Sequence, residues 1–155
     1  MGDQLTDFIR SRHEQAGRPE IDWQAKKDRW IRSVGELYTH VQAMLRESVE
    51  SRDVTLRTFD VDVTEDFIGS YKIPVLELSV GDERVEFRPK GVNVIGAAGR
   101  VDIRGERDTV TLVKDAATGE SEWNVVLQRV PHRKTAPLDS ESLKYALELV
   151  MLPLR

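Results

Sequence analysis

The apolar residues of this chain change their spacing near residue 51, and this change constrains the fold more than any other feature. Before it, apolar residues recur at helical intervals, as Val34, Leu37 and Val41 do. After it, they alternate with polar residues in short segments separated by turn signals, as Leu76 and Leu78 do. A period of 3.6 residues predicts amphipathic helices, and a period of two predicts half-buried strands. Helices followed by consecutive strands are typical of an α+β fold.

Composition narrows the class of protein. The chain has 155 residues, 39% hydrophobic and 32% charged, which predicts one globular domain over residues 1–155 and argues against disorder. The net charge of −4 argues against a main role in coating nucleic acid or anionic membranes. The absence of cysteine excludes disulfides, thiolate catalysis and Cys-ligated metals. With no signal-like start and no run of about 18 apolar residues, we expect a soluble, cytoplasmic protein.

Two helices are predicted before the strands, over residues 4–15 and 22–50. Asp22 is a suitable N-cap for the second. Its apolar stripe is wider than the seam of a coiled coil, so we expect this long helix to lie across a sheet or other helices. Gly35 costs about 1 kcal/mol relative to Ala, which predicts a bend or the close approach of another backbone. The apolar residues of the first helix share one side: Leu5, Phe8 and Ile9.

The strands are predicted to be joined by connections too short for crossover helices, so the sheet should be an antiparallel meander of about five to seven strands. The apolar parity changes within the first strand, which predicts a β-bulge near Arg57–Thr58. Gly81–Asp82 is a hairpin turn signal, and residues 131–137 are predicted to form a loop. The predicted strands are residues 53–63, 73–80, 83–88, 92–95, 100–104, 109–114 and 122–130.

A final helix is predicted to begin after Asp139, its N-cap, and to pack on the same sheet face as the N-terminal helices. Leu138 is placed to contact Leu143 as a hydrophobic staple. The predicted apolar face of this helix consists of Leu143, Leu147, Val150 and Leu154.

Aromatic residues on the long helix give the leading functional hypothesis. Trp23, Trp30 and Tyr38 could anchor a partner protein, because aromatic residues are enriched at binding hot spots. The alternative is that they simply belong to the core. The chain shows no metal set, nucleophile constellation or cofactor loop, so we expect neither a cofactor nor a metal. The leading prediction is therefore a non-enzymatic module that binds another protein or itself, including as a homodimer.

A small-residue segment gives another hypothesis, a small-ligand or enzyme site. Gly96-Ala-Ala-Gly99 could expose backbone N–H groups to an anion, with Asn93, Arg100 and Asp102 nearby. It matches neither the dinucleotide fingerprint nor the P-loop, and no helix follows it. The alternative is that the small residues let the chain turn between strands.

Two clusters of like charge complete the candidates. Arg129, His132, Arg133 and Lys134 could contact phosphates of a nucleic acid, against which the acidity of the chain argues. Asp60 and Asp62 lie two apart in a strand, so their carboxylates share a face and could bind a divalent cation. A solvent-facing row of carboxylates explains the same pattern.

Overall fold

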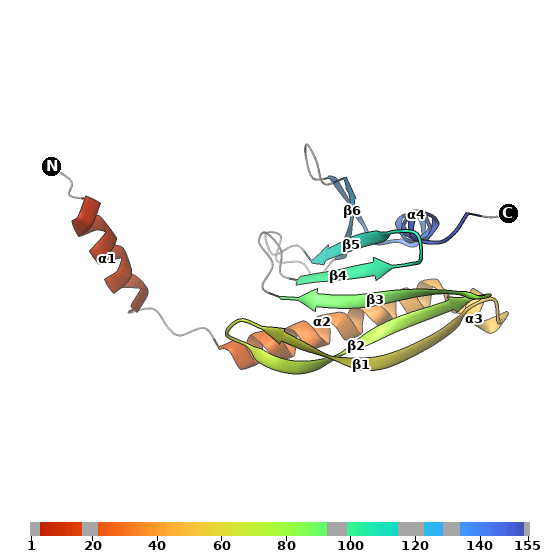
Figure 1. Ribbon diagram of the computed structural model, residues 1–155, viewed down its shortest axis with the longest axis horizontal. Helices are drawn as coiled ribbons and strands as arrows, with labels where there is room; N and C mark the ends of the chain where they lie inside the picture. The colour runs from red at the N-terminus through yellow and green to blue at the C-terminus, as the bar shows by residue number, and fades with distance from the viewer. Residues whose placement is uncertain (1–3, 17–21, 93–98, 115–122, 129–133, 154–155) are drawn as a thin grey trace.

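The computed structural model describes residues 4–16, 22–92, 99–114, 123–128 and 134–153, and it confirms the α+β fold class (Figure 1). The elements in chain order are α1 (Gln4–Ala16), α2 (Trp23–Met44), α3 (Arg46–Glu50), β1 (Thr55–Glu65), β2 (Gly69–Val80), β3 (Glu83–Gly91), β4 (Gly99–Arg104), β5 (Thr109–Lys114), β6 (Trp123–Gln128), β7 (Lys134–Pro137) and α4 (Ser140–Val150). Among the described residues, no helix combines the length and hydrophobicity that a bilayer crossing requires.

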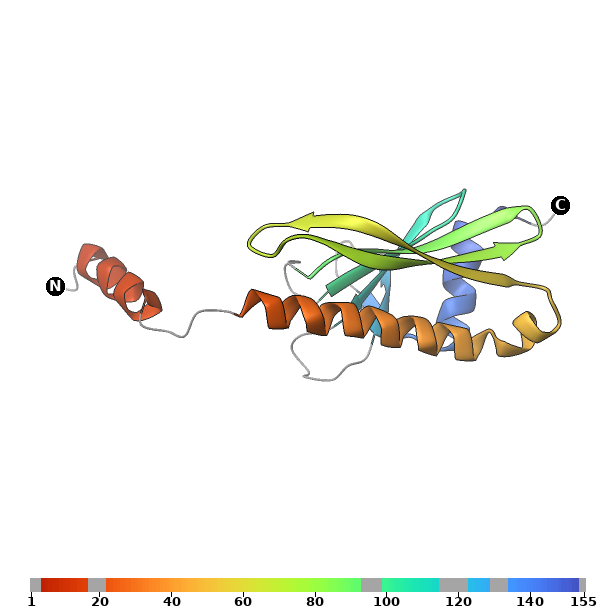
Figure 2. The same cartoon turned by 90° about the horizontal axis from the view of Figure 1, so that it is seen from below.

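The long helix α2 lies along one face of the sheet, and α1 stands away from the rest of the molecule beyond the first residues of α2 (Figures 1 and 2). The predicted N-cap is confirmed, because the Asp22 side chain accepts a hydrogen bond from the N–H of Ala25 at 3.0 Å. The predicted single helix over residues 22–50 is wrong at one point. The helix breaks at Leu45, and α3 then ends before Arg52, whose positive φ of 65° reverses the chain toward β1.

The sheet is a seven-stranded antiparallel meander with strand order β1-β2-β3-β4-β5-β6-β7. The predicted bulge near Arg57–Thr58 is wrong, because β1 and β2 pair without a register shift from Thr55 opposite Ser79 to Glu65 opposite Gly69. Figure 2 shows this hairpin twisting strongly along its length. Opposite the change of apolar parity, residues of both parities of β2 are buried, from Val75 to Leu78, so both sides of the sheet are covered there and no bulge is needed.

The turns between strands follow the predicted chemistry in part. Gly81 has a φ of 59° in the turn between β2 and β3, where the Gly81–Asp82 signal placed it. The predicted loop over residues 131–137 is wrong at its end, because β7 pairs with β6 there, with Ala136 opposite Val125. That pairing is a tertiary contact, and the short segment itself has no alternation of apolar residues that would predict a strand. The predicted strand 92–95 lies mostly outside the described residues.

One continuous hydrophobic core joins α2 and α4 to the sheet. Trp30, Val34, Leu37 and Val41 of α2 are buried in it together with inward residues of β2 to β6. The predicted cap and staple of α4 are confirmed. Asp139 and Ser142 form reciprocal side-chain to backbone hydrogen bonds of 2.9 Å, and Leu138 and Leu143 are both buried in the core.

Candidate functional site

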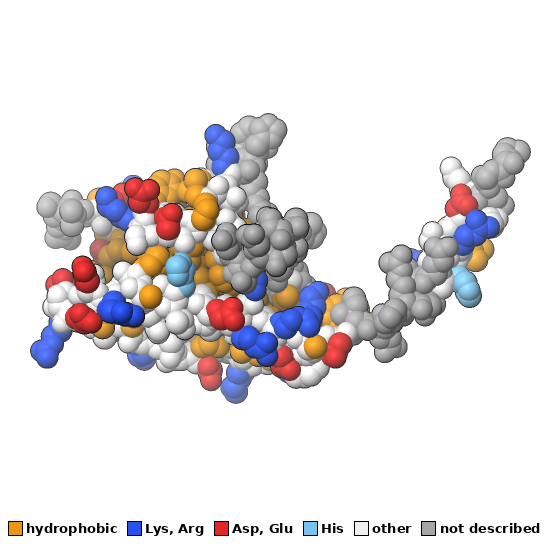
Figure 3. Space-filling model, turned by 180° about the vertical axis from the view of Figure 1, so that it is seen from behind, with side chains coloured by type: hydrophobic (Ala, Val, Ile, Leu, Met, Phe, Trp, Pro, Cys, Tyr) orange, Lys and Arg blue, Asp and Glu red, His pale blue; other side chains and the backbone are white. Residues whose placement is uncertain are grey.

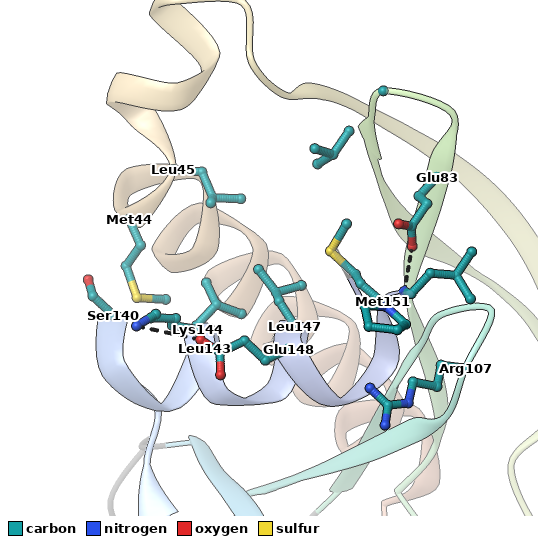
Figure 4. Close-up of a pocket in the computed structure, with 14 residues that line it drawn as sticks. Met44, Leu45, Glu83, Arg107, Ser140, Leu143, Lys144, Leu147, Glu148 and Met151 are labelled. Atoms are coloured by element: carbon teal, nitrogen blue, oxygen red, sulfur yellow. Dashed lines mark hydrogen bonds and ion pairs between the residues drawn. The ribbon is translucent and has the colours of Figure 1, made fainter. Parts of the chain in front are cut away.

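An apolar groove of about 790 Å³ lies where three parts of the chain meet: the end of α2, the length of α4 and the β2–β3 turn (Figure 4). Hydrophobic side chains gather in a hollow beside the end of α2 and α4 in Figure 3. Two residues at its mouth are well exposed, Val80 at 38% and Leu152 at 49%. The groove lining consists of Met44, Leu45, Val80, Gly81, Glu83, Arg107, Ser140, Leu143, Lys144, Leu147, Glu148, Met151, Leu152 and Pro153.

Hydrogen bonds at the end of α4 hold the walls of the groove in place. The Glu83 carboxylate in the β2–β3 hairpin accepts from the N–H of Leu152 at 2.9 Å, as Figure 4 shows. The N–H of Arg107 donates to the carbonyl oxygen of Val150 at 2.9 Å. Gly105 makes this approach possible, since an added Cβ would lie only 2.7 Å from the Val150 carbonyl carbon. The last turn of α4 is therefore tied to two strand turns.

The chemistry of the groove suits an apolar segment of another chain. Leu143 and Leu147 lie four residues apart on one side of α4, and Met151, the C-cap residue of α4, lines the groove beyond them, so the three form one apolar ridge. Met44 faces them from α2, and methionine side chains adapt to differently shaped partners. The charged side chains are at the rim, where Lys144 and Glu148 lie 3.5 Å apart. An apolar floor with a charged rim is typical of sites that receive an amphipathic helix.

The aromatic residues predicted to bind a partner divide between core and surface. Trp30 and Tyr38 are 2% and 4% exposed and belong to the core. The Tyr38 hydroxyl lies 2.7 Å from the Pro74 carbonyl oxygen and 2.9 Å from that of Phe87, and burial raises the pKa of Tyr38. Only Trp23 reaches the surface, where it stacks on Phe67 with ring centroids 5.3 Å apart.

The predicted ligand residues lie on β4, near the end of the sheet opposite the groove. Arg100 and Asp102 form a two-bonded ion pair, with N–O distances of 2.8 and 3.2 Å. Asp102 is 4% exposed and Thr111 also donates to it, at 3.4 Å. The guanidinium of Arg100 is thus already engaged by a carboxylate of its own strand. Asn93 lies outside the described residues.

A second polar network ties the tip of the β1–β2 hairpin to the end of β3. The Tyr71 hydroxyl donates to the Glu65 carboxylate, which also accepts from the N–H of Val92 at 2.8 Å. Burial first, and this bond to Glu65 second, raise the pKa of Tyr71. Gly91 leaves the room that the Glu65 side chain occupies.

The remaining predicted residues are exposed or undescribed. Lys134 begins β7 at the surface, whereas Arg129, His132 and Arg133 lie outside the described residues. Asp60 and Asp62 are both exposed on β1, as the solvent-facing interpretation requires, and Asp62 pairs with Lys72 at 3.1 Å.

No protein-family model, curated protein or solved structure matches the chain significantly. Within the described ranges, no three His, Cys, Asp or Glu side chains gather as metal ligands would. The groove is the site that reasoning from the sequence missed. Its residues stood in predicted elements, but only the packing of distant elements brings Met44 and Leu147 into one groove.

Proposed function

We propose that the protein is a non-enzymatic, cytoplasmic binding module whose groove between α2, α4 and the β2–β3 turn receives an amphipathic helix. The observation that carries the proposal is the lining of the groove. Leu147, Met44 and Met151 are only partly buried there, and Val80 and Leu152 are exposed, between charged side chains at the rim. Large apolar surfaces that stay exposed in a folded protein commonly mark interaction sites.

The size of the groove supports a helix as its occupant. A helix with its side chains is roughly 10–12 Å across, and it presents three or four apolar side chains over two turns. Side chains at positions i, i+3 and i+4 would fit against the Leu143–Leu147–Met151 ridge as one helix packs on another. The Lys144, Glu148 and Glu83 charges at the rim would then face the polar flanks of the bound helix.

The test is site-specific photo-crosslinking in living cells of the full chain, with a benzophenone amino acid at the groove mouth. Val80 and Leu152 are suitable positions because both are exposed there, and Thr58, exposed on β1, is the matched control. We expect discrete protein adducts from Val80 and Leu152 but not from Thr58. Mass spectrometry should locate the crosslink in an amphipathic helix.

A second variant checks that the groove itself makes the contact. Leu147→Asp places a carboxylate on the groove floor and should abolish the adducts while the far-UV circular dichroism spectrum stays that of the wild type. Absence of adducts at both mouth positions, or equal adducts at Thr58, would refute the proposed function. An adduct with a lipid or small molecule alone would also refute it.

A further inference from the structure

The outward face of α2 carries a row of polar side chains in which acidic and basic residues alternate. Asp28, Arg32, Glu36 and His40 follow one another at intervals of four residues and are all exposed. Residues four apart are neighbours on one face of a helix. A shallow hollow of about 810 Å³ runs beside this row, lined by Arg32, Gly35, Glu36, Thr39, His40 and Ala43.

This row is complementary to itself in one antiparallel register. When Arg32 lies opposite Glu36 of a second copy, two-fold symmetry places Glu36 opposite Arg32 of that copy. Asp28 then faces His40 of the second copy, so no two like charges face each other in this register. If the second helix is shifted by one turn in one direction, Glu36 faces Glu36 of the second copy. If it is shifted by one turn in the other direction, Arg32 faces Arg32 of the second copy. Like charges directly opposite each other destabilise an interface, so the row selects one register.

Gly35 lies beside the symmetry axis of this register. Nothing lies within 4 Å of where its Cβ would be, so packing among the described residues does not explain the glycine. A glycine inside a helix costs about 1 kcal/mol relative to alanine. At the axis it allows the backbones of two helices to approach closely, with the small side chains of Thr39 and Ala43 along the same hollow.

The same register brings α1 to the groove of the second copy. It sets Trp23 opposite Leu45 of the second copy, and Leu45 lines the groove. Figure 3 shows that α2 and the hollow at the groove lie on the same face of the molecule. From Ala16 to Trp23 the chain can span at most about 24 Å. Its own groove begins about 32 Å from Trp23 along α2, so even a fully extended connection would leave Ala16 short of the groove of its own chain.

The exposed side of α1 has the pattern that the groove suits. Phe8 and Ile9 are 56% and 57% exposed, and with Leu5 they occupy positions i, i+3 and i+4 of the helix. Both figures of the ribbon show α1 away from the body of its own chain. Each copy thus offers one apolar helix and one apolar groove, at opposite ends of α2.

We propose that two copies pair antiparallel along α2, with α1 of each copy seated in the groove of the other. This inference rests on the proposed function and names the helix that the groove receives. Such a two-fold arrangement is closed, because each donor helix and each groove is used once.

The test is the oligomeric state of the full chain by sedimentation velocity over a range of protein concentrations. We expect a dimer of twice the 17.7 kDa chain mass. Arg32→Glu and Glu36→Arg should each raise the dissociation constant by roughly tenfold or more, because each sets like charges opposite each other twice. The double variant R32E/E36R exchanges the two charges and should restore the wild-type constant.

Controls separate this arrangement from other dimers. Arg84→Glu makes the same charge change on exposed β3 and should leave the dissociation constant unchanged. Replacing Phe8 and Ile9 by Ser should weaken the dimer without altering the folded monomer. A monomer at all concentrations, a dimer indifferent to the single charge changes, or a double variant without recovery would each overturn the inference.

The crosslinks at Val80 and Leu152 tell the failure of the dimer from that of the groove. Adducts of twice the chain mass, joined to α1, support both proposals. Adducts with a different protein, from a chain that sediments as a monomer, overturn the dimer and leave the groove as a binding site. A monomer without adducts overturns both.

Discussion

Two glycines offer the same substitution with opposite expected effects. Gly35→Ala adds a methyl group to an exposed position of α2 with no atom within 4 Å. Alanine favours the helix by about 1 kcal/mol over glycine, and no clash offsets this. For a chain of this size, the melting temperature should rise by about 2–4 °C.

Gly99→Ala adds the same methyl group where the core has no room for it. The new Cβ would lie 2.7 Å from Cε3 and 2.9 Å from Cη2 of Trp30, which is 2% exposed. Trp30 in turn lies against Trp123, with ring centroids 5.9 Å apart, so its ring cannot move freely. Overpacking of this kind costs about 1–3 kcal/mol. We therefore expect a loss of stability of that size.

Urea unfolding at low protein concentration measures both changes, since association then adds little to the free energy of unfolding. The slope m should stay constant between variants, so that a change in midpoint reports stability. A destabilised monomer for Gly35→Ala, or an unchanged midpoint for Gly99→Ala, would refute the packing argument. At high protein concentration Gly35→Ala should also weaken the proposed dimer, because the added methyl group would lie beside the two-fold axis, where the two α2 helices approach each other.

Two further predictions concern polar groups that hold elements together. Tyr38→Phe leaves the carbonyl oxygens of Pro74 and Phe87 without the hydroxyl donor. Urea unfolding should therefore show a free energy of unfolding lower by about 1–3 kcal/mol. An unchanged free energy of unfolding would show that water replaces the hydroxyl. The backbone N–H of Ser142 holds the pKa of Asp139 below its ordinary 3.8, so this carboxylate adds stability above that pH, which is lost as the pH falls through the folded-state pKa. In acid titrations followed by circular dichroism, Asp139→Asn should therefore lack part of the loss of stability below pH 4 that the wild type shows, and identical acid profiles would contradict this.

The features that follow from neighbours in sequence were predictable. Asp22 and Asp139 cap helices because a side chain needs to reach only two or three residues along the chain. Gly81 marks a hairpin because the turn itself requires a positive φ. Alternation of apolar residues follows from the pleat of each strand, so the antiparallel meander and the α+β class were also predictable.

Features that depend on contacts between residues far apart in sequence were not predictable from the sequence. The parity change around Arg57 suggested a bulge, but the paired hairpin twists as a unit and keeps its register. The pairing of β7 with β6 likewise depends on a neighbouring strand.

The amino-acid sequence by itself determined most of the helices and strands and the apolar stripe of α2, because spacing along the chain sets these locally. Only the tertiary structure decided that Trp30 and Tyr38 are buried in the core while Trp23 is partly exposed. It also decided that Met44, Leu147 and Val80 share one groove. These residues lie far apart in sequence, and their meeting depends on the curvature of the sheet and the return of α4 to α2. No local pattern encodes that meeting.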